Sequence, residues 1–296
     1  MVIKMKATEW IPALSTGALD TASLEAMYSA GLRAIEISTK PELYPQIDWK
    51  RLTCDSDRVG IRLWSLHLPF YGPRRVDIST TDSDMRAYSL ELMREYIAKS
   101  GDAGIKICVI HPSTEPNPLG DGRDELIDIS SESLASLADY AAKYGVTIAV
   151  EELPRTCLGN NSSELLRLIS KNDKLRVCFD TNHLLGEDHR SFIKAVGKKI
   201  ITLHVSDYDF LNERHWLPGE GKIDWVGVVD SLESVGYDGV LLYELGLTPP
   251  NTIDRRELTY ADFYNNYLSL VNKRPPEVFG KPIDEACLKN AYVQPK

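Results

Sequence analysis

Short apolar runs of strand length alternate with longer amphipathic runs along the chain, and this alternation most constrains the fold. The short runs are apolar through their length, which is typical of parallel strands buried on both faces. The predicted strands are residues 2–8, 33–38, 62–68, 106–111, 147–153, 175–180, 200–206 and 239–245. Strand and helix therefore recur as consecutive βα units.

Helices are predicted between these strands from apolar residues at helical spacing. Four of them end on a glycine, a residue that tolerates the left-handed conformation of a helix stop. They are residues 20–32 with Gly31, 83–101 with Gly101, 131–145 with Gly145 and 224–236 with Gly236. A fifth helix, 161–172, opens on Asn161 with Glu164 three residues later, close to a capping box. Residues 186–190 are predicted to begin another, with Asp188 near its N-cap.

Eight βα units in about 270 residues fit a (β/α)8 TIM barrel, an α/β fold in a single domain. A doubly wound sheet is the rival, but residues 17–20 lack the glycine-rich turn expected after its first strand. No linker divides the chain. We therefore predict a barrel over residues 1–274 and a C-terminal tail over 275–296.

Composition favours a globular protein without a membrane span. Hydrophobic residues make up 43% of the 296 residues, enough for a sizeable core, and no apolar run is long enough for a membrane span. The first ten residues lack the apolar region of a signal peptide. The five cysteines have no CxxC spacing, and Cys108 and Cys178 lie in apolar runs as expected of buried thiols. We expect a reducing, cytoplasmic location.

The net charge of −9 disfavours nucleic acid as the main partner, because binding to phosphates needs clustered Lys and Arg. The tail and the exposed helix faces leave a homodimer open.

Ionisable side chains gather at the C-terminal ends of the predicted strands, where (β/α)8 barrels carry their chemistry. Five of the six histidines, all but His189, lie at a strand end or in the loop that follows it. The strand-end residues are His67, His111, Glu151, Glu152, Asp180, His183, His204 and Glu244. Carboxylates brought together there would repel one another unless arginines or a cation neutralised them. Imidazoles among the carboxylates favour a divalent metal, Zn, Mn or Fe rather than Mg.

Two points stay open at this level. Side chains alternate across a strand, so only one of Glu151 and Glu152 faces the barrel interior, and the flanking residues do not settle which. A metal-free binding protein would instead need the acids to be paired with arginines such as Arg155 and Arg214.

The strand-end motifs together resemble the xylose-isomerase-like TIM barrels, a group of sugar isomerases, sugar epimerases and endonuclease IV enzymes. They are "SLHLPF", "VIHPS", "VEELPR", "FDTNHLLGED", "HVSDYD", "ERHWLPGEGKIDW" and "LLYEL". The resemblance implies a metal held by Glu151, Asp180, His204 and Glu244, with His183 contacting substrate. It selects Glu151 as the inward residue and leaves Glu152 to point towards the loop and pair with a surface arginine.

The endonuclease IV branch uses further metal positions, which match His67, His111, His183, Glu213 and His215. Glu213 stands where that branch has aspartate, and this departure places the third metal in doubt.

The resemblance implies a divalent-metal-dependent sugar or sugar-phosphate isomerase or epimerase. Glu151 and Glu244 would transfer the proton through a metal-stabilised enediolate, and His183, Arg155 and Arg214 would bind the carbohydrate. The polar loop 112–125 reads as a lid or a substrate-selecting loop. Two alternatives are an endonuclease IV-like multi-metal phosphoesterase, marked by two or three ions per chain rather than one, and a 3-keto-glycoside lyase.

Overall fold

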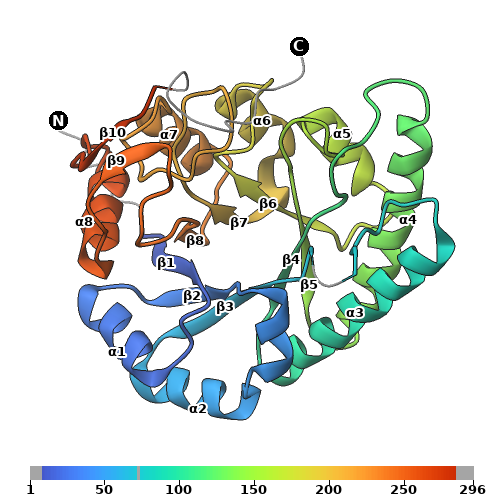
Figure 1. Ribbon diagram of the computed structural model, residues 1–296, viewed down its shortest axis with the longest axis horizontal. Helices are drawn as coiled ribbons and strands as arrows, with labels where there is room; N and C mark the ends of the chain where they lie inside the picture. Colours follow the sequence, from blue (N-terminus) through green and yellow to red (C-terminus); the bar gives the residue numbers. More distant parts are fainter. Residues whose placement is uncertain (1–8, 72–73, 285–296) are drawn as a thin grey trace.

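A computed structural model describes residues 9–71 and 74–284. Its eight parallel strands follow the chain in the order β7-β6-β5-β4-β3-β2-β1-β8 and surround a common interior (Figure 1). A parallel bridge between Val205 and Tyr243 joins β7 to β8, with the Val205 amide donating to the Leu242 carbonyl at 2.8 Å. The sheet is thereby brought to the nearly closed form of a (β/α)8 barrel, which confirms the predicted fold.

Seven of the eight predicted strands are barrel strands. The bounds are β1 Ile11–Thr16, β2 Ala34–Ile37, β3 Arg62–His67, β4 Ile107–Ile110, β5 Thr147–Glu151, β6 Arg176–Asp180, β7 Ile200–His204 and β8 Val240–Tyr243. The first strand was not predicted, because Pro12 near its start argues against a strand. The predicted strand 2–8 lies outside the described residues.

The helices pack around the barrel (Figure 1). They are α1 Thr21–Ala30, α2 Trp49–Val59, α3 Ser83–Asp102, α4 Arg123–Ala142, α5 Ser162–Leu168, α6 His189–Val196, α7 Trp225–Ser234 and α8 Tyr260–Val271, with short 3-10 helices η1 Pro41–Gln46 and η2 Gly197–Lys199. Gly31 caps α1 in the left-handed conformation, as predicted, with φ of 110°. Gly101 does not end α3, which continues to Asp102. Asn161 and Asp188 cap α5 and α6, also as predicted.

The barrel interior changes from apolar to polar along the barrel axis. Small apolar residues fill it nearer the N-terminal ends of the strands, in two buried clusters: Ala13, Ala34, Val240 and Leu242, and Ile107, Val109, Ala149 and Cys178. Trp64 packs against both clusters. Closer to the C-terminal ends the buried interior residues are polar, beginning with Glu36 and Ser65, both 0% exposed. The apolar plug therefore forms the floor of a polar mouth.

Part of the predicted tail folds back onto the barrel. Strand β10, Gly280–Pro282, pairs antiparallel with β9, Ile253–Arg255, in the connection between β8 and α8. The buried Arg255 side chain donates to Glu220 at 2.8 Å, which ties β9 to the loop before α7. Residues 285–296 of the tail lie outside the described residues.

In the part of the chain that the structure describes, no helix combines the length and apolarity needed to cross a bilayer. Cys108 and Cys178 are buried free thiols, as expected from their apolar runs.

Candidate metal and substrate site

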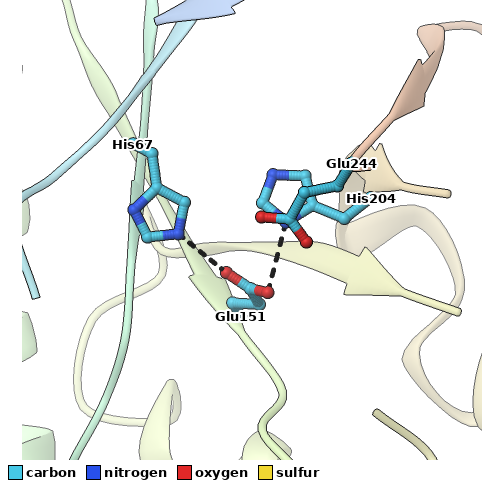
Figure 2. A group of neighbouring side chains, drawn as sticks. All are labelled: His67, Glu151, His204 and Glu244. Carbon is cyan, nitrogen blue, oxygen red and sulfur yellow. Dashed lines mark hydrogen bonds and ion pairs between the residues drawn. The ribbon is translucent and has the colours of Figure 1, made fainter. Parts of the chain in front are cut away.

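Side chains from separate strands converge at the barrel mouth, as Figure 2 shows for four of them. Glu151 ends β5 and lies between two histidines: its Oε1 is 3.2 Å from Nδ1 of His204 on β7, and its Oε2 is 3.3 Å from Nε2 of His67 on β3. Glu244 follows β8, and its Oε1 is 3.4 Å from the same Nδ1 of His204. The inward direction of Glu151 agrees with the prediction.

Asp180 and His183 extend this group on the other side of Glu151. Asp180 ends β6, and its Oδ2 is 3.3 Å from Nε2 of His183, while Nδ1 of His183 is 3.4 Å from Glu151 Oε1. The residues form two sets whose ligand atoms all lie within 4.8 Å of one another: His67, Glu151, His204 and Glu244, and Glu151, Asp180 and His183. Glu151 is common to both sets.

The donor set fits a divalent cation. Oδ2 of Asp180 is buried and accepts no hydrogen bond, although Nε2 of His183 lies 3.3 Å away. A buried carboxylate oxygen without a hydrogen bond is costly unless a positive charge, from His183 or from a bound cation, meets it. Carboxylates from three strands and the imidazole of His204 offer the mixed oxygen and nitrogen ligands that Zn, Mn and Fe accept. The residues that the family resemblance assigns to the ion, Glu151, Asp180, His204 and Glu244, are drawn from both sets.

Burial and charge move the pKa values of these groups in opposite directions. Burial would raise the pKa of Glu151, but the facing His204 and His111 lower it well below its usual value. Burial, with Asp180 and Glu151 nearby, raises the pKa of Glu244 well above its usual range despite His204. The two carboxyl groups that share His204 therefore differ in proton affinity.

Glu36 on β2 belongs to the site and was not predicted. It is 0% exposed inside the barrel and accepts hydrogen bonds from Ser15 at 2.9 Å, Ser65 at 2.8 Å and Nε2 of His204 at 2.9 Å. When Nε2 donates to Glu36, the lone pair of His204 is left on Nδ1, the nitrogen that faces Glu151 and Glu244. The signal in the sequence was an acid in the middle of the apolar run 33–38.

Glu152 does not point towards the loop, and the expected pairing with a surface arginine is wrong. The side chain is 0% exposed, and its Oε1 accepts the backbone amide of Asp180 at 2.7 Å. Burial and the neighbouring Asp180 raise the pKa of Glu152 well above its usual value. Glu152 thus supports the start of the loop after β6.

His67 and His111 approach Glu151 from the side of β3 and β4. Nε2 of His111 is 3.3 Å from Glu151 Oε2, the same oxygen that His67 contacts. Phe70 covers both imidazoles, with ring centroids 5.0 Å from His67 and 4.3 Å from His111. These histidines lie where a second ion or substrate hydroxyl groups would reach Glu151.

The predicted substrate arginines are engaged by protein carboxylates. Arg155 contacts Glu115 and Glu213, and Arg214 donates from Nε to Asp209 at 2.8 Å with only 4% of the residue exposed. The charge of Arg214 is therefore directed at Asp209.

A cavity of about 230 Å³ opens beside His183. Its lining is made by the loops after β5 and β6: Arg155, Asn160, Asn161, His183, Leu185 and Gly186. The position next to the ligand cluster makes it a candidate for the part of a substrate that extends away from the reacting carbons.

Asp207, three residues after His204, has a structural role. Asp207 is buried and accepts from the amides of Gly219 at 2.8 Å and Ile223 at 3.2 Å and from the indole of Trp225 at 2.9 Å. Asp207 therefore shapes the Gly-Glu-Gly turn into α7 and is directed away from the ligand cluster.

Comparison with known proteins matches the chain to one family model and to relatives with different activities. The family model for xylose isomerase-like TIM barrels matches residues 24–261. An inosose isomerase from Bacillus subtilis is 28% identical over 185 residues, 56% of this chain and 66% of its own length. A probable endonuclease 4 from Acholeplasma laidlawii is 28% identical over 157 residues, 48% of this chain and 52% of its own length. The chain thus spans about half to two thirds of these relatives.

Among solved structures, a D-tagatose 3-epimerase-like protein superimposes with a TM-score of 0.72 at 23% identity, covering 88% of this chain and 98% of the other. This likeness concerns the fold. Together with the family match over most of the barrel, it leads to one conclusion: the chain belongs to the xylose isomerase-like TIM barrel family.

Proposed function

We propose that this protein is a divalent-metal-dependent isomerase or epimerase of a sugar or related polyol ketone. The observation that carries the proposal is the clustering of carboxylates and imidazoles at the barrel mouth, where Glu151 belongs both to a set with His67, His204 and Glu244 and to a set with Asp180 and His183. The proposed ligands are Glu151, Asp180, His204 and Glu244. The inosose isomerases and sugar epimerases among its relatives and structural neighbours support this class of chemistry. A Zn, Mn or Fe ion, when bound, would supply Lewis-acid stabilisation of charge on the substrate oxygens.

Glu151 and Glu244 are proposed to move the proton. They enter the mouth from β5 and β8, and each lies close to Nδ1 of His204, at 3.2 and 3.4 Å. One carboxylate removes the proton next to the carbonyl and the other returns it, on the opposite face for epimerisation. His183, beside the 230 Å³ cavity, is proposed to bind substrate hydroxyl groups.

The proposal predicts the behaviour of two conservative variants. Glu151→Gln and Glu244→Gln should each reduce turnover by at least about a hundredfold, because an amide cannot accept the proton. The assay follows conversion of a panel of free and phosphorylated ketoses, and of inosose, by the protein loaded with Mn or Zn in deuterated water. Deuterium should enter the product at the carbon that changes configuration.

The exposed acid Asp57 on the outer helix α2 provides the control, since Asp57→Asn should leave turnover unchanged. Near-full activity of either glutamine variant with a native circular dichroism spectrum would remove that residue from the mechanism.

A multi-metal phosphoesterase is the second candidate, favoured by the two histidines, His67 and His111, on the second oxygen of Glu151. The similarity of this chain to a probable endonuclease 4 also supports the phosphoesterase. One tightly bound ion per chain would favour the isomerase, and hydrolysis of abasic-site DNA with two or three ions would favour the phosphoesterase. A 3-keto-glycoside lyase shares the proton abstraction and is distinguished by release of the aglycone from oxidised glycosides. Cytoplasmic location and a homodimer stay predictions.

A further inference from the structure

Glu213 has both of its carboxylate oxygens engaged. It lies on the loop between β7 and α7, and the resemblance to the endonuclease IV branch matches it, like His183 and His215, to a further metal position. Oε1 of Glu213 is 3.1 Å from Nε2 of His183, and Oε2 accepts a hydrogen bond from Nη1 of Arg155. The side chain of Glu213 is only 24% exposed, so this ion pair is partly shielded from water.

Arg155 is held in place by three further contacts. Its Nε and Nη2 lie 3.0 and 2.9 Å from Oε2 of Glu115, and its Nη1 donates to Asn212 at 2.9 Å. The backbone of Arg155 is left-handed, with φ of 55°, a conformation that carries a cost for a residue other than glycine. The guanidinium therefore ties together the loops after β4, β5 and β7, and it stays charged at every pH at which the protein is folded.

His215 is held at the barrel mouth by the backbone that follows β8. Its Nδ1 is 3.0 Å from the carbonyl oxygen of Glu244. In residues 9–71 and 74–284, two clusters of three or more metal-ligating groups are found, and both are built on Glu151. Neither includes Glu213 or His215. Of these groups, Glu213 contacts both His183 and Arg155, and His215 contacts the backbone of Glu244.

We propose that the guanidinium of Arg155 takes the place of a third cation in this mouth. It neutralises Glu213 and repels a dication from the space between His183, Glu213 and His215, so ions are confined to positions around Glu151. This inference rests on the metal site of the proposed function, but not on the identity of the substrate. Glu213 then does not ligate a metal. It orients His183, which lines the proposed substrate cavity.

Metal stoichiometry tests the proposal on the full-length protein. Wild type, Arg155→Met and Arg155→Lys are saturated with zinc, freed of excess zinc by gel filtration, and analysed for zinc and protein. Methionine keeps much of the length of arginine without its charge, so Arg155→Met should bind one more zinc ion per chain than wild type. Arg155→Lys keeps the charge and should match wild type. Adding Glu213→Gln to Arg155→Met should remove the additional ion.

An unchanged zinc content in folded Arg155→Met would overturn the proposal. Should that variant fail to fold, wild-type crystals soaked in zinc decide through anomalous scattering. Density at Glu151 without density at Glu213 is expected, and a zinc peak between Glu213 and His215 would refute the assignment of Arg155. Failure of the proposed function is a separate result, because it would leave wild type without zinc at Glu151 while the difference between the variants could still be measured.

Discussion

At the scale of single residues, the candidate site depends on Glu36, a carboxylate buried beneath His204 inside the barrel. Glu36 accepts hydrogen bonds from Ser15, Ser65 and His204, which lie on three different strands. Burial would raise the pKa of Glu36, but His204 and His67 lower it. A charged acceptor on Nε2 orients the imidazole and increases the basicity of Nδ1, the nitrogen that would bind the ion.

Glu36→Gln should therefore weaken metal binding by about ten- to a hundredfold, because the amide keeps a hydrogen-bond acceptor but loses the charge. Competition with a chromophoric chelator measures the affinity. Asp262→Asn, a carboxylate change on the outer helix α8, serves as the control and should leave metal affinity unchanged. Wild-type affinity in Glu36→Gln would show that Glu36 serves packing alone.

At the scale of elements, the turn before α7 fixes the loop that carries Glu213 and His215. Gly221 lies against Asp207 so closely that an added Cβ would be 2.2 Å from Oδ1 of Asp207 and 2.4 Å from the Tyr208 carbonyl oxygen. The Gly-Glu-Gly sequence is thus required by the close approach of the turn to the buried carboxylate that organises it.

Gly221→Ala should lower the free energy of unfolding by about 1–3 kcal/mol, since backbone and a buried carboxylate must move to admit the methyl group. Gly120, where a Cβ would meet no atom within 4 Å, provides the matched control, and Gly120→Ala should be close to neutral. Urea denaturation measures both. Equal stability of the two variants would contradict the proposed constraint.

Helix α8 begins with a capping box in which Thr259 and Asp262 bond reciprocally to each other's backbone amides, and Arg256 pairs with Asp262 at 2.8 and 2.9 Å. The Arg256 hydrogen bonds are the main cause that lowers the pKa of Asp262 to about 2. Since this is below the unfolded value of about 3.9, the stabilisation is complete above about pH 4 and is lost as the pH falls towards 2.

Asp262→Asn should accordingly cost about 1 kcal/mol of stability at pH 7, and less as the pH drops below 4. Denaturation of both proteins at pH 7, 4 and 3 measures the difference. A difference that does not shrink towards pH 3 would show that the ionised form of Asp262 is not what stabilises the cap.

At the scale of the whole molecule, the proposed metal ligands all come from one half of the barrel. The proposed ligands Glu151, Asp180, His204 and Glu244 come from β5 to β8, so a cation bound by them would hold the C-terminal ends of these four strands together. A ligand that binds only the folded state stabilises it by about 2.7 kcal/mol at a concentration a hundred times its Kd.

Added Mn or Zn should raise the melting temperature, and hydrogen exchange should slow at the C-terminal ends of β5 to β8 more than in α2 and α3. Removal of metal with EDTA should reverse both effects. Exchange that slows equally over the whole chain, or not at all, would contradict a site shared by those four strands.

The sequence by itself determined the repeated βα units, since apolar runs such as 175–180 and caps such as Asn161 and Asp188 are local signals. It also determined which strand ends carry ligands, because residues at the ends of parallel strands must meet at one mouth. Only the tertiary structure decided that Glu36 reaches His204, that Glu152 is buried, and that Arg155 contacts Glu213. Those contacts join residues 28 to 168 positions apart, and no local pattern reports which distant partner neutralises a buried charge.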